Sequence, residues 1–244
     1  MRSVTGDTLR PGGLALTDRA LDLCRFAPGS ALLDVGCGLG TTVAHLAERG
    51  FVATGVEPSE TLVERARRER PHVDVRAAVA ESLPFPEACF DGAFMECSLS
   101  LIGDVPLALG ELRRVLRPGA LLVVTDVYRR GAQKTWQAEG RTCLRGVGSR
   151  AAFCDLLLRC GFVARVWEDH TNVLRELAAR IVFAHGSLEA FFDLVGLRPV
   201  GDRVCRPADL GYFLAIAERS PAGCLPDVSV ALLDAQGRKV GDTR

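Results

Sequence analysis

Short apolar runs alternate with amphipathic stretches over most of the chain. Apolar runs of about four to eight residues, bounded by glycine or polar residues, are typical of strands buried on both faces. The stretches between them place apolar side chains on one face of a helix. We therefore predict seven strands, at residues 31–35, 51–56, 73–78, 90–95, 120–125, 162–166 and 212–217.

Helices are predicted in the intervals between these strands. Ser59 is placed as a helix N-cap, Pro71 ends the same helix, and Gly50 ends the helix before it. Ahead of the first strand, Thr17 either caps a helix or lies in a segment that folds over a ligand. The helices are predicted at residues 41–49, 59–70, 104–116, 149–159 and 171–197, the last of them interrupted near Gly186.

This order predicts an α/β fold with a doubly wound, seven-stranded and mostly parallel sheet of the Rossmann-like type. The long interval before the last strand lets that strand enter antiparallel. With 244 residues, 48% of them hydrophobic, the chain has material for one core. We expect a single domain over residues 1–220, with an N-terminal cap segment at 1–28, a lid loop at 131–148 and a C-terminal tail at 221–244.

Composition narrows the possible partners. The 30 basic and 30 acidic residues balance, so no overall field favours nucleic acid or an anionic membrane. Residues 1–11 lack the apolar run of a signal peptide, and no stretch offers about 20 uninterrupted apolar residues for a membrane span. Nine cysteines without CxxC spacing predict reduced thiols and no metal site. These features predict a soluble cytoplasmic protein that acts on a small molecule; they do not determine its oligomeric state.

A glycine-rich loop follows the first predicted strand, with the sequence Asp34-Val35-Gly36-Cys37-Gly38-Leu39-Gly40. Ligands of open α/β sheets bind at the carboxyl ends of strands, and glycines let the backbone approach them closely. Dinucleotide loops have the spacing GxGxxG, whereas the spacing here is GxGxG. The carboxylate of Asp34 suits the ammonium and sulfonium of S-adenosylmethionine (SAM) better than a pyrophosphate. An NAD(P)-binding oxidoreductase is the alternative.

Glu57 ends the second predicted strand, 17 residues after Gly40. An acidic side chain at this position can accept hydrogen bonds from both hydroxyls of a ribose. The alternative role is that of an acid at a helix N-terminus, favoured by the helix dipole. Because both cofactors contain ribose, Glu57 does not separate them.

Three further motifs follow in order: Ala80-Glu81-Ser82-Leu83-Pro84-Phe85, then Phe90-Asp91, then Glu111-Leu112-Arg113-Arg114-Val115-Leu116-Arg117-Pro118-Gly119. Together with the glycine loop they resemble successive motifs of class I SAM-dependent methyltransferases, and the nearest relatives look like the small-molecule enzymes of quinone biosynthesis. The resemblance covers residues 32–126. It implies methyl transfer from SAM to a small-molecule acceptor, with S-adenosylhomocysteine as product.

The resemblance also implies which residues bind the cofactor. The methionine part is expected at the glycine loop, the ribose at the second strand end, and the adenine against a proline ring and two backbone groups. Where relatives often carry an aspartate that bonds the adenine amine, this chain has Val79. The implied residues are Asp34, Gly36, Gly38 and Gly40 with Cys37 packed in the loop, then Glu57, Pro58, Ala80, Glu81 and, near the methyl group, Glu96.

The segment after the fourth strand is where relatives place residues beside the transferring methyl. Methyl transfer from a sulfonium needs alignment and a dry site, and a base only when the nucleophile requires one. The histidine of some relatives is replaced by Ser100, which argues against a histidine base here. Cys97 and Glu96 are candidates to line the active site, although a free cysteine is more often a small buried hydrophobe.

A weaker resemblance leads to a second hypothesis. The segment that begins at Thr125 and includes Cys143 looks like the region of arsenite methyltransferases in which a cysteine binds arsenic. A metalloid methyltransferase using Cys143 and Cys97 as thiolates is therefore an alternative. The family's cysteine upstream of the glycine loop is missing, and its late cysteine motif is not recognisable. A third hypothesis is a non-catalytic SAM-binding protein with a closed acceptor pocket.

Overall fold

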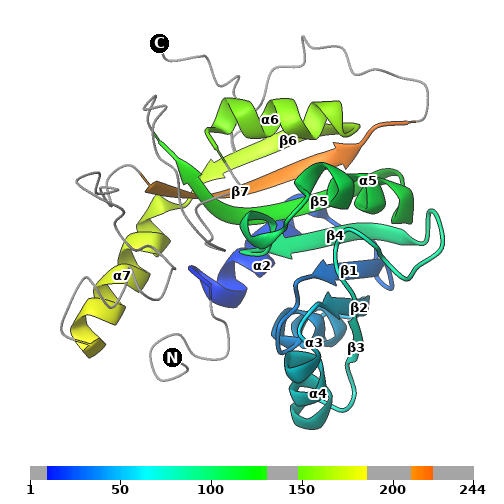
Figure 1. Cartoon of the computed structure of the whole chain (residues 1–244), viewed down its shortest axis with the longest axis horizontal. Helices are drawn as coiled ribbons and strands as arrows, with labels where there is room; N and C mark the ends of the chain where they lie inside the picture. Colours follow the sequence, from blue (N-terminus) through cyan, green and yellow to red (C-terminus); the bar gives the residue numbers. More distant parts are fainter. Residues whose placement is uncertain (1–9, 131–147, 186–209, 222–244) are drawn as a thin grey trace.

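The structure is a computed structural model, which describes residues 10–130, 148–185 and 210–221. Its centre is a seven-stranded sheet in the order β3-β2-β1-β4-β5-β7-β6 (Figure 1). The strands are β1 (Ala31–Val35), β2 (Val52–Glu57), β3 (Asp74–Ala77), β4 (Phe90–Glu96), β5 (Leu116–Arg129), β6 (Phe162–Asp169) and β7 (Leu210–Arg219). The helices are α2 (Gly13–Cys24), α3 (Thr41–Glu48), α4 (Glu60–Glu69), η1 (Leu99–Leu101), α5 (Val105–Val115), α6 (Arg150–Arg159) and α7 (Thr171–His185).

The predicted fold class is confirmed. The strands β1 to β5 pair in parallel, and β7 lies antiparallel between β5 and β6. The chain runs from β1 outward to β3 and then returns to the other side of β1 at β4. The carboxyl ends of β1 and β4 therefore form the switch point of the sheet, which is where open α/β sheets bind their ligands.

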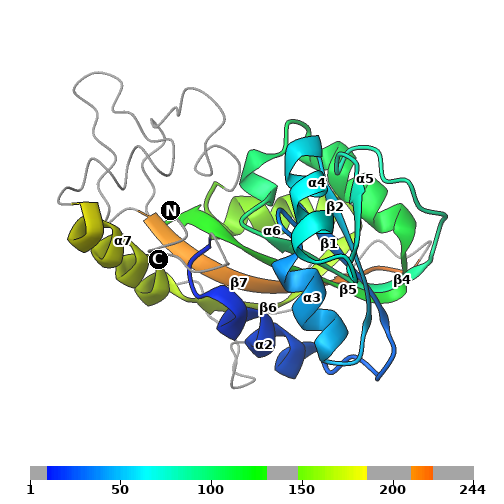
Figure 2. The same ribbon diagram turned by 90° about the horizontal axis from the view of Figure 1, so that it is seen from below.

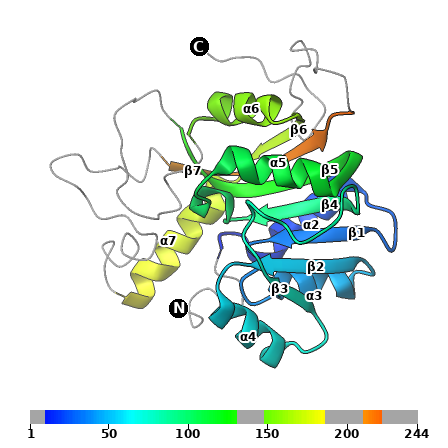
Figure 3. The same cartoon turned by 45° about the vertical axis from the view of Figure 1, so that its right-hand side comes forward.

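Alternate residues of each strand face two separate helical layers. Leu33, Ala93 and Leu122 belong to the core under α5 and α6. Their neighbours in sequence, at positions 32, 94 and 123, face the core under α2, α3 and α7. Figure 2 shows α2 and α3 next to each other on one face, and Figure 3 shows α7 extending beyond the strand ends. The period-two burial explains why the central strands are continuous apolar runs.

Local sequence signals predicted several helix boundaries correctly. The hydroxyls of Ser59 and Ser149 accept hydrogen bonds from the backbone N–H groups of Leu62 and Ala152, which makes both serines N-caps. Gly50 has φ +87°, a left-handed conformation that glycine adopts without strain, directly after the end of α3.

Two predictions were wrong in detail. The fifth strand was expected at residues 120–125 but runs from Leu116 to Arg129, because Leu116 pairs with Phe90 of β4 and Arg129 with Leu210 of β7. Thr17 does not cap a helix: it lies inside α2, whose N-cap is Gly12 with φ 75°. Residues 131–147 of the lid loop predicted at 131–148, the end of the helix beyond residue 185 and most of the C-terminal tail lie outside the described residues.

Candidate functional site

A cavity of about 550 Å³ opens at the carboxyl ends of β1, β2 and β4. Its volume lies within the range of small-molecule sites, about 300–1,000 Å³. Five of the residues assigned to the cofactor site from the sequence line it, together with the candidate active-site residue Cys97: Gly36, Glu57, Pro58, Ala80 and Glu81. The structure thus brings together residues from four separate segments of the chain.

The glycine loop meets this cavity at Val35 and Gly36 and has a conformation that suits glycine. Gly36, Gly38 and Gly40 all have positive φ, at 78°, 54° and 71°. The backbone N–H groups of Gly36 and Cys37 donate to the carbonyl of Val56 at 2.8 and 3.0 Å, so the loop is tied to the end of β2. Gly38 and Gly40 do not line the cavity, and their role in binding stays a prediction.

Gly36→Ala is expected to lower the free energy of unfolding by about 3 kcal/mol, from left-handed strain and overlap together. A Cβ atom on Gly36 would lie 2.5 Å from the Cβ of Ser98, which is held by a 2.6 Å hydrogen bond to the carbonyl of Val35. Thermal denaturation would measure the effect. The matched control is Gly110→Ala in the exposed face of α5, where nothing lies within 4 Å and stability should rise by about 1 kcal/mol. Equal melting of both variants and the parent would contradict this account of the loop.

Glu57 lies where an acid at a helix N-terminus is expected, and its role in ribose binding stays a prediction. Its side chain is buried, lines the cavity, and accepts hydrogen bonds from the backbone N–H groups of Gly38 (3.1 Å) and Ser59 (3.0 Å). It therefore fastens the glycine loop to the N-terminus of α4. A carboxylate offers about four lone-pair positions, so both oxygens retain capacity for ligand hydroxyls.

Asp34 is a buried carboxylate without a protein partner in the part of the chain that the structure describes. Its residue is 3% exposed, and it pairs through its backbone between β2 and β4. Burial, the nearby carboxylate of Glu96 and that of Glu57 raise the pKa of Asp34 far above its ordinary value, against the opposing charge of Arg10. Asp34 is not among the residues that line the cavity, although the next two residues, Val35 and Gly36, are. A cation bound beside Asp34 would favour the ionised carboxylate and lower its pKa again.

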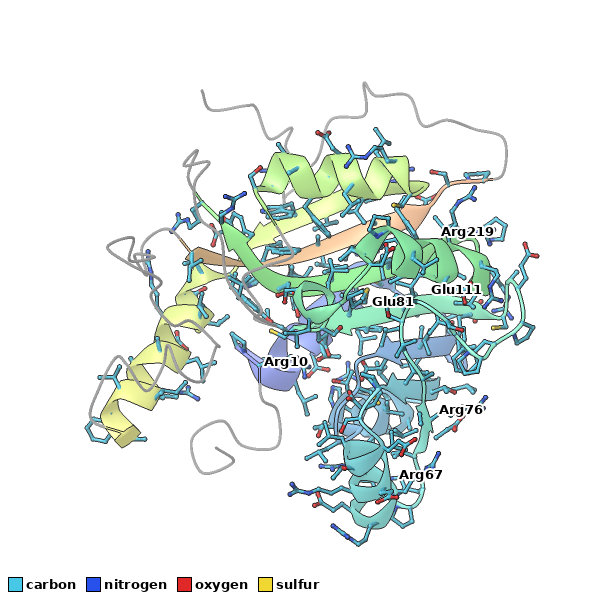
Figure 4. All side chains as sticks on the ribbon, viewed as in Figure 1. Arg10, Arg67, Arg76, Glu81, Glu111 and Arg219 are labelled. Carbon is cyan, nitrogen blue, oxygen red and sulfur yellow. The ribbon has the colours of Figure 1, made fainter. Side chains whose placement is uncertain are left out.

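Glu96 is not on the cavity wall but in a buried cluster beside it. Its carboxylate accepts hydrogen bonds from the hydroxyls of Thr17 (2.9 Å) and Thr42 (2.8 Å) and pairs with Arg10 at 2.7 Å. The cluster joins the end of β4 to α2 and α3. Its members lie far apart in the sequence. Figure 4 shows Arg10 beside α2, near the ends to which the β1 and β4 arrows point.

Arg10 was not identified from the sequence. Its side chain is 9% exposed; burial alone would lower the pKa of its guanidinium, but the charge of Glu96, with contributions from Tyr212, Asp34 and Cys97, raises it instead. The guanidinium therefore stays charged in the buried cluster that it forms with Glu96. A single arginine in a segment without periodicity gives no signal that could have found it.

Cys97 lies on the cavity wall with φ +56°, an uncommon conformation for a residue with a side chain. Its sulfur is 3.0 Å from the hydroxyl of Tyr212, which in turn donates to the hydroxyl of Thr125 at 3.2 Å. Burial, followed by the influence of Cys97, holds the pKa of Tyr212 well above its ordinary value. The phenol is therefore neutral and serves as a hydrogen-bonding group.

Ser100 faces Asp126 and does not line the cavity. Its backbone N–H and its hydroxyl donate to the two carboxylate oxygens of Asp126 at 2.9 and 2.8 Å. Burial raises the pKa of Asp126 to about 6, although these bonds and one from Val127 oppose the shift. The serine at this position is thus a partner of a buried acid.

The far wall of the cavity is formed by the segment after η1. Leu101, Ile102 and Gly103 face Val79 and Ala80 across the cavity. The carboxylate of Glu81 accepts hydrogen bonds from the N–H groups of Gly103 (3.2 Å) and Asp104 (3.3 Å). Glu81 is labelled in Figure 4. Its side chain therefore braces this wall, which leaves its backbone for a ligand.

Comparison with known proteins gives this site a family. Residues 33–124 match the family model described as a methyltransferase domain. These residues are a class I methyltransferase domain. A demethylmenaquinone methyltransferase of Beutenbergia cavernae is 35% identical over 124 residues, which cover 50% of this chain and 52% of the relative. The chain thus spans about half the length of the curated relatives it matches.

Solved structures agree with the methyltransferase fold. The crystal structure of the [4+2]-cyclase SpnF superposes with a TM-score of 0.66 at 29% identity, covering 86% of this chain and 82% of the other. A geranyl diphosphate C-methyltransferase from Streptomyces coelicolor, solved with S-adenosyl-L-homocysteine, gives a TM-score of 0.67 at 20% identity and covers 90% of this chain and 89% of the other.

The remaining candidates of the methyltransferase domain lie elsewhere. The sulfur of Cys37 packs beside Gly55 and Val43 in the core under α3, and Cys37 does not line the cavity. Cys143 lies outside the described residues. Within the described ranges, no group of three or more His, Cys, Asp or Glu residues is arranged to hold a metal ion. Among the same residues, no helix has both the length and the apolar character needed to cross a bilayer.

Proposed function

We propose that the chain binds SAM in the 550 Å³ cavity and transfers its methyl group to a small-molecule acceptor. The observation that carries this proposal is the buried carboxyl group of Asp34, which has no hydrogen-bond partner among the described residues, at the start of a glycine loop and near Glu57 on the cavity wall. These residues fit a cationic nucleoside and fit a dinucleotide pyrophosphate poorly, because a buried carboxylate repels phosphate. SAM, when bound, supplies an electrophilic methyl group on a sulfonium.

The chain's own contribution is binding and alignment. Asp34 would hold the ammonium group, Glu57 the ribose hydroxyls, and the walls at Pro58 and Ala80 the adenine. Cys97, fixed by Tyr212, would face the reacting centre and exclude water from it. The described residues place no unpaired histidine or carboxylate on the cavity wall next to Cys97, which favours an acceptor that needs no strong base.

The names of relatives support a small-molecule acceptor without defining it. One relative is a demethylmenaquinone methyltransferase and one structural neighbour a geranyl diphosphate C-methyltransferase. A neighbour called a [4+2]-cyclase shows that the same fold serves a different reaction, which keeps a SAM-binding protein without methyl transfer as a second candidate. The metalloid hypothesis depends on Cys143.

Calorimetry and a transfer assay together test the proposal. S-adenosylhomocysteine should bind to the purified chain with measurable heat, and NAD should not. Radiolabelled SAM should then label at least one member of a panel of phenols, quinols, amines and carboxylic acids. Binding of NAD in place of S-adenosylhomocysteine would refute the cofactor assignment, and binding without any transfer would favour the non-catalytic candidate.

A further inference from the structure

A second cavity, of about 320 Å³, lies between the N-terminal end of α2 and the helix α7. One wall is formed by Arg10 and the residues that follow it, up to Ala15. The other wall is one face of α7, which contributes Val173, Leu177 and two charged side chains. None of these residues lines the larger cavity. The volume suffices for a small organic molecule.

The charged side chains around this smaller cavity differ in their partners. Arg10 is paired at 2.7 Å with Glu96, which does not line the cavity. In the part of the chain that the structure describes, neither Arg180 nor Glu176 forms an ion pair with another residue. The carboxylate of a ligand can therefore pair with Arg180 in a cavity that Arg10 also lines.

Arg10 connects the smaller cavity to the methyltransferase site. One guanidinium nitrogen, Nη2, contacts Glu96 and Thr17, while the buried Nε has no hydrogen-bond partner within the described residues. An arginine has five N–H donors in a fixed fork, so Arg10 can hold Glu96 on one side and a further carboxylate on another. The same guanidinium lies near Cys97, which lines the larger cavity.

We propose that the smaller cavity binds the carboxylate of the acceptor through Arg10 and Arg180, and that the acceptor is a small carboxylic acid. This inference rests on the proposed methyl transfer. Val173 and Leu177 provide apolar contacts for the carbon skeleton. Glu176 opposes a second negative charge, which disfavours phosphate dianions relative to a carboxylate. Because SAM also carries a carboxylate, the test has to separate the acceptor's carboxylate from that of the cofactor.

Arg180 and Glu176 allow this test, since both side chains are exposed on α7 and their replacement should leave the fold intact. Binding of benzoate and of its uncharged counterpart benzamide would be followed by ligand-observed NMR, with and without saturating S-adenosylhomocysteine. Benzoate should bind and benzamide should bind far more weakly. Arg180→Gln should weaken benzoate binding about fivefold, and Glu176→Gln should strengthen it about twofold. The matched control is Arg175→Gln, an exposed arginine of the same helix outside the cavity, which should change nothing.

The possible outcomes separate this proposal from the proposed function. Equal binding of benzoate and benzamide, or identical affinities in Arg180→Gln and Arg175→Gln, would overturn the carboxylate site. If Arg180→Gln instead weakens S-adenosylhomocysteine binding, measured by calorimetry, the cavity receives the cofactor's carboxylate and the proposal also fails. If the unaltered chain binds benzoate with the expected charge dependence but not S-adenosylhomocysteine, the carboxylate site stands and the cofactor assignment falls.

Discussion

Asp34→Asn is expected to weaken SAM binding by about 2 kcal/mol, roughly thirtyfold, because a charged partner of the ammonium group is removed. The same substitution should stabilise the ligand-free protein, since it removes a buried carboxylate without a hydrogen-bond partner among the described residues. Calorimetry measures the first effect and thermal denaturation the second. Opposite signs for affinity and stability are characteristic of a residue that serves binding.

The stability effect should depend on pH in a defined direction. In the unfolded chain the Asp34 carboxyl has its ordinary pKa near 4, whereas burial raises the pKa in the folded protein. The folded state therefore binds the proton more tightly, and its stability falls as the pH rises from the ordinary pKa to the raised one. The difference in melting temperature between Asp34→Asn and the parent should grow over that window. A matched control is Asp155→Asn on the exposed face of α6, which should be neutral in both assays. Unchanged SAM affinity in Asp34→Asn would remove the basis of the cofactor site.

Glu96→Gln is expected to lower the free energy of unfolding by about 3 kcal/mol, because it leaves the buried guanidinium of Arg10 without its counter-charge. The substitution keeps the shape of the side chain, so packing is unchanged and the effect reports the lost charge. Urea denaturation of the parent and the variant would measure it.

The matched control for Glu96→Gln is Glu218→Gln. Glu218 pairs with Arg165 at 2.9 Å, but both side chains are exposed by about a third or more, so the loss should stay below about 1 kcal/mol. Equal losses in the two variants would show that Arg10 does not depend on Glu96. A double variant that also replaces Arg10 with methionine should recover part of the stability lost in Glu96→Gln, since no buried charge then remains.

Local chemistry made much of the fold predictable. The glycines at positions 36, 38 and 40 and the capping serines Ser59 and Ser149 act within a few residues of themselves, so the sequence reveals what they do. Short continuous apolar runs likewise predicted the central strands. By contrast, the length of β5 depends on β7, which joins it from more than 80 residues further along the chain, and no local pattern encodes such a partner.

The candidate site was predictable to the same extent. Residues at strand ends, such as Glu57 and Cys97, were placed on the cavity because parallel strands bring their carboxyl ends together. Glu96 was predicted to line the active site, but it lies off the cavity wall in contact with Arg10 and Thr17. No local pattern reveals these contacts, since they join residues 86 and 79 positions apart in the sequence. The second cavity could not be anticipated, because its walls come from α2 and α7 at opposite ends of the described chain.

The place of β7 inside the sheet has a consequence for how the protein forms. β7 is the last described strand in the chain, yet it fills the position between β5 and β6. During synthesis, one edge of β5 keeps unpaired N–H and C=O groups until residues 210–219 leave the ribosome. Until then β6 also lacks the strand with which it pairs. A nascent chain halted before Leu210 would therefore expose an unpaired strand edge, and we expect it to bind chaperones or to aggregate.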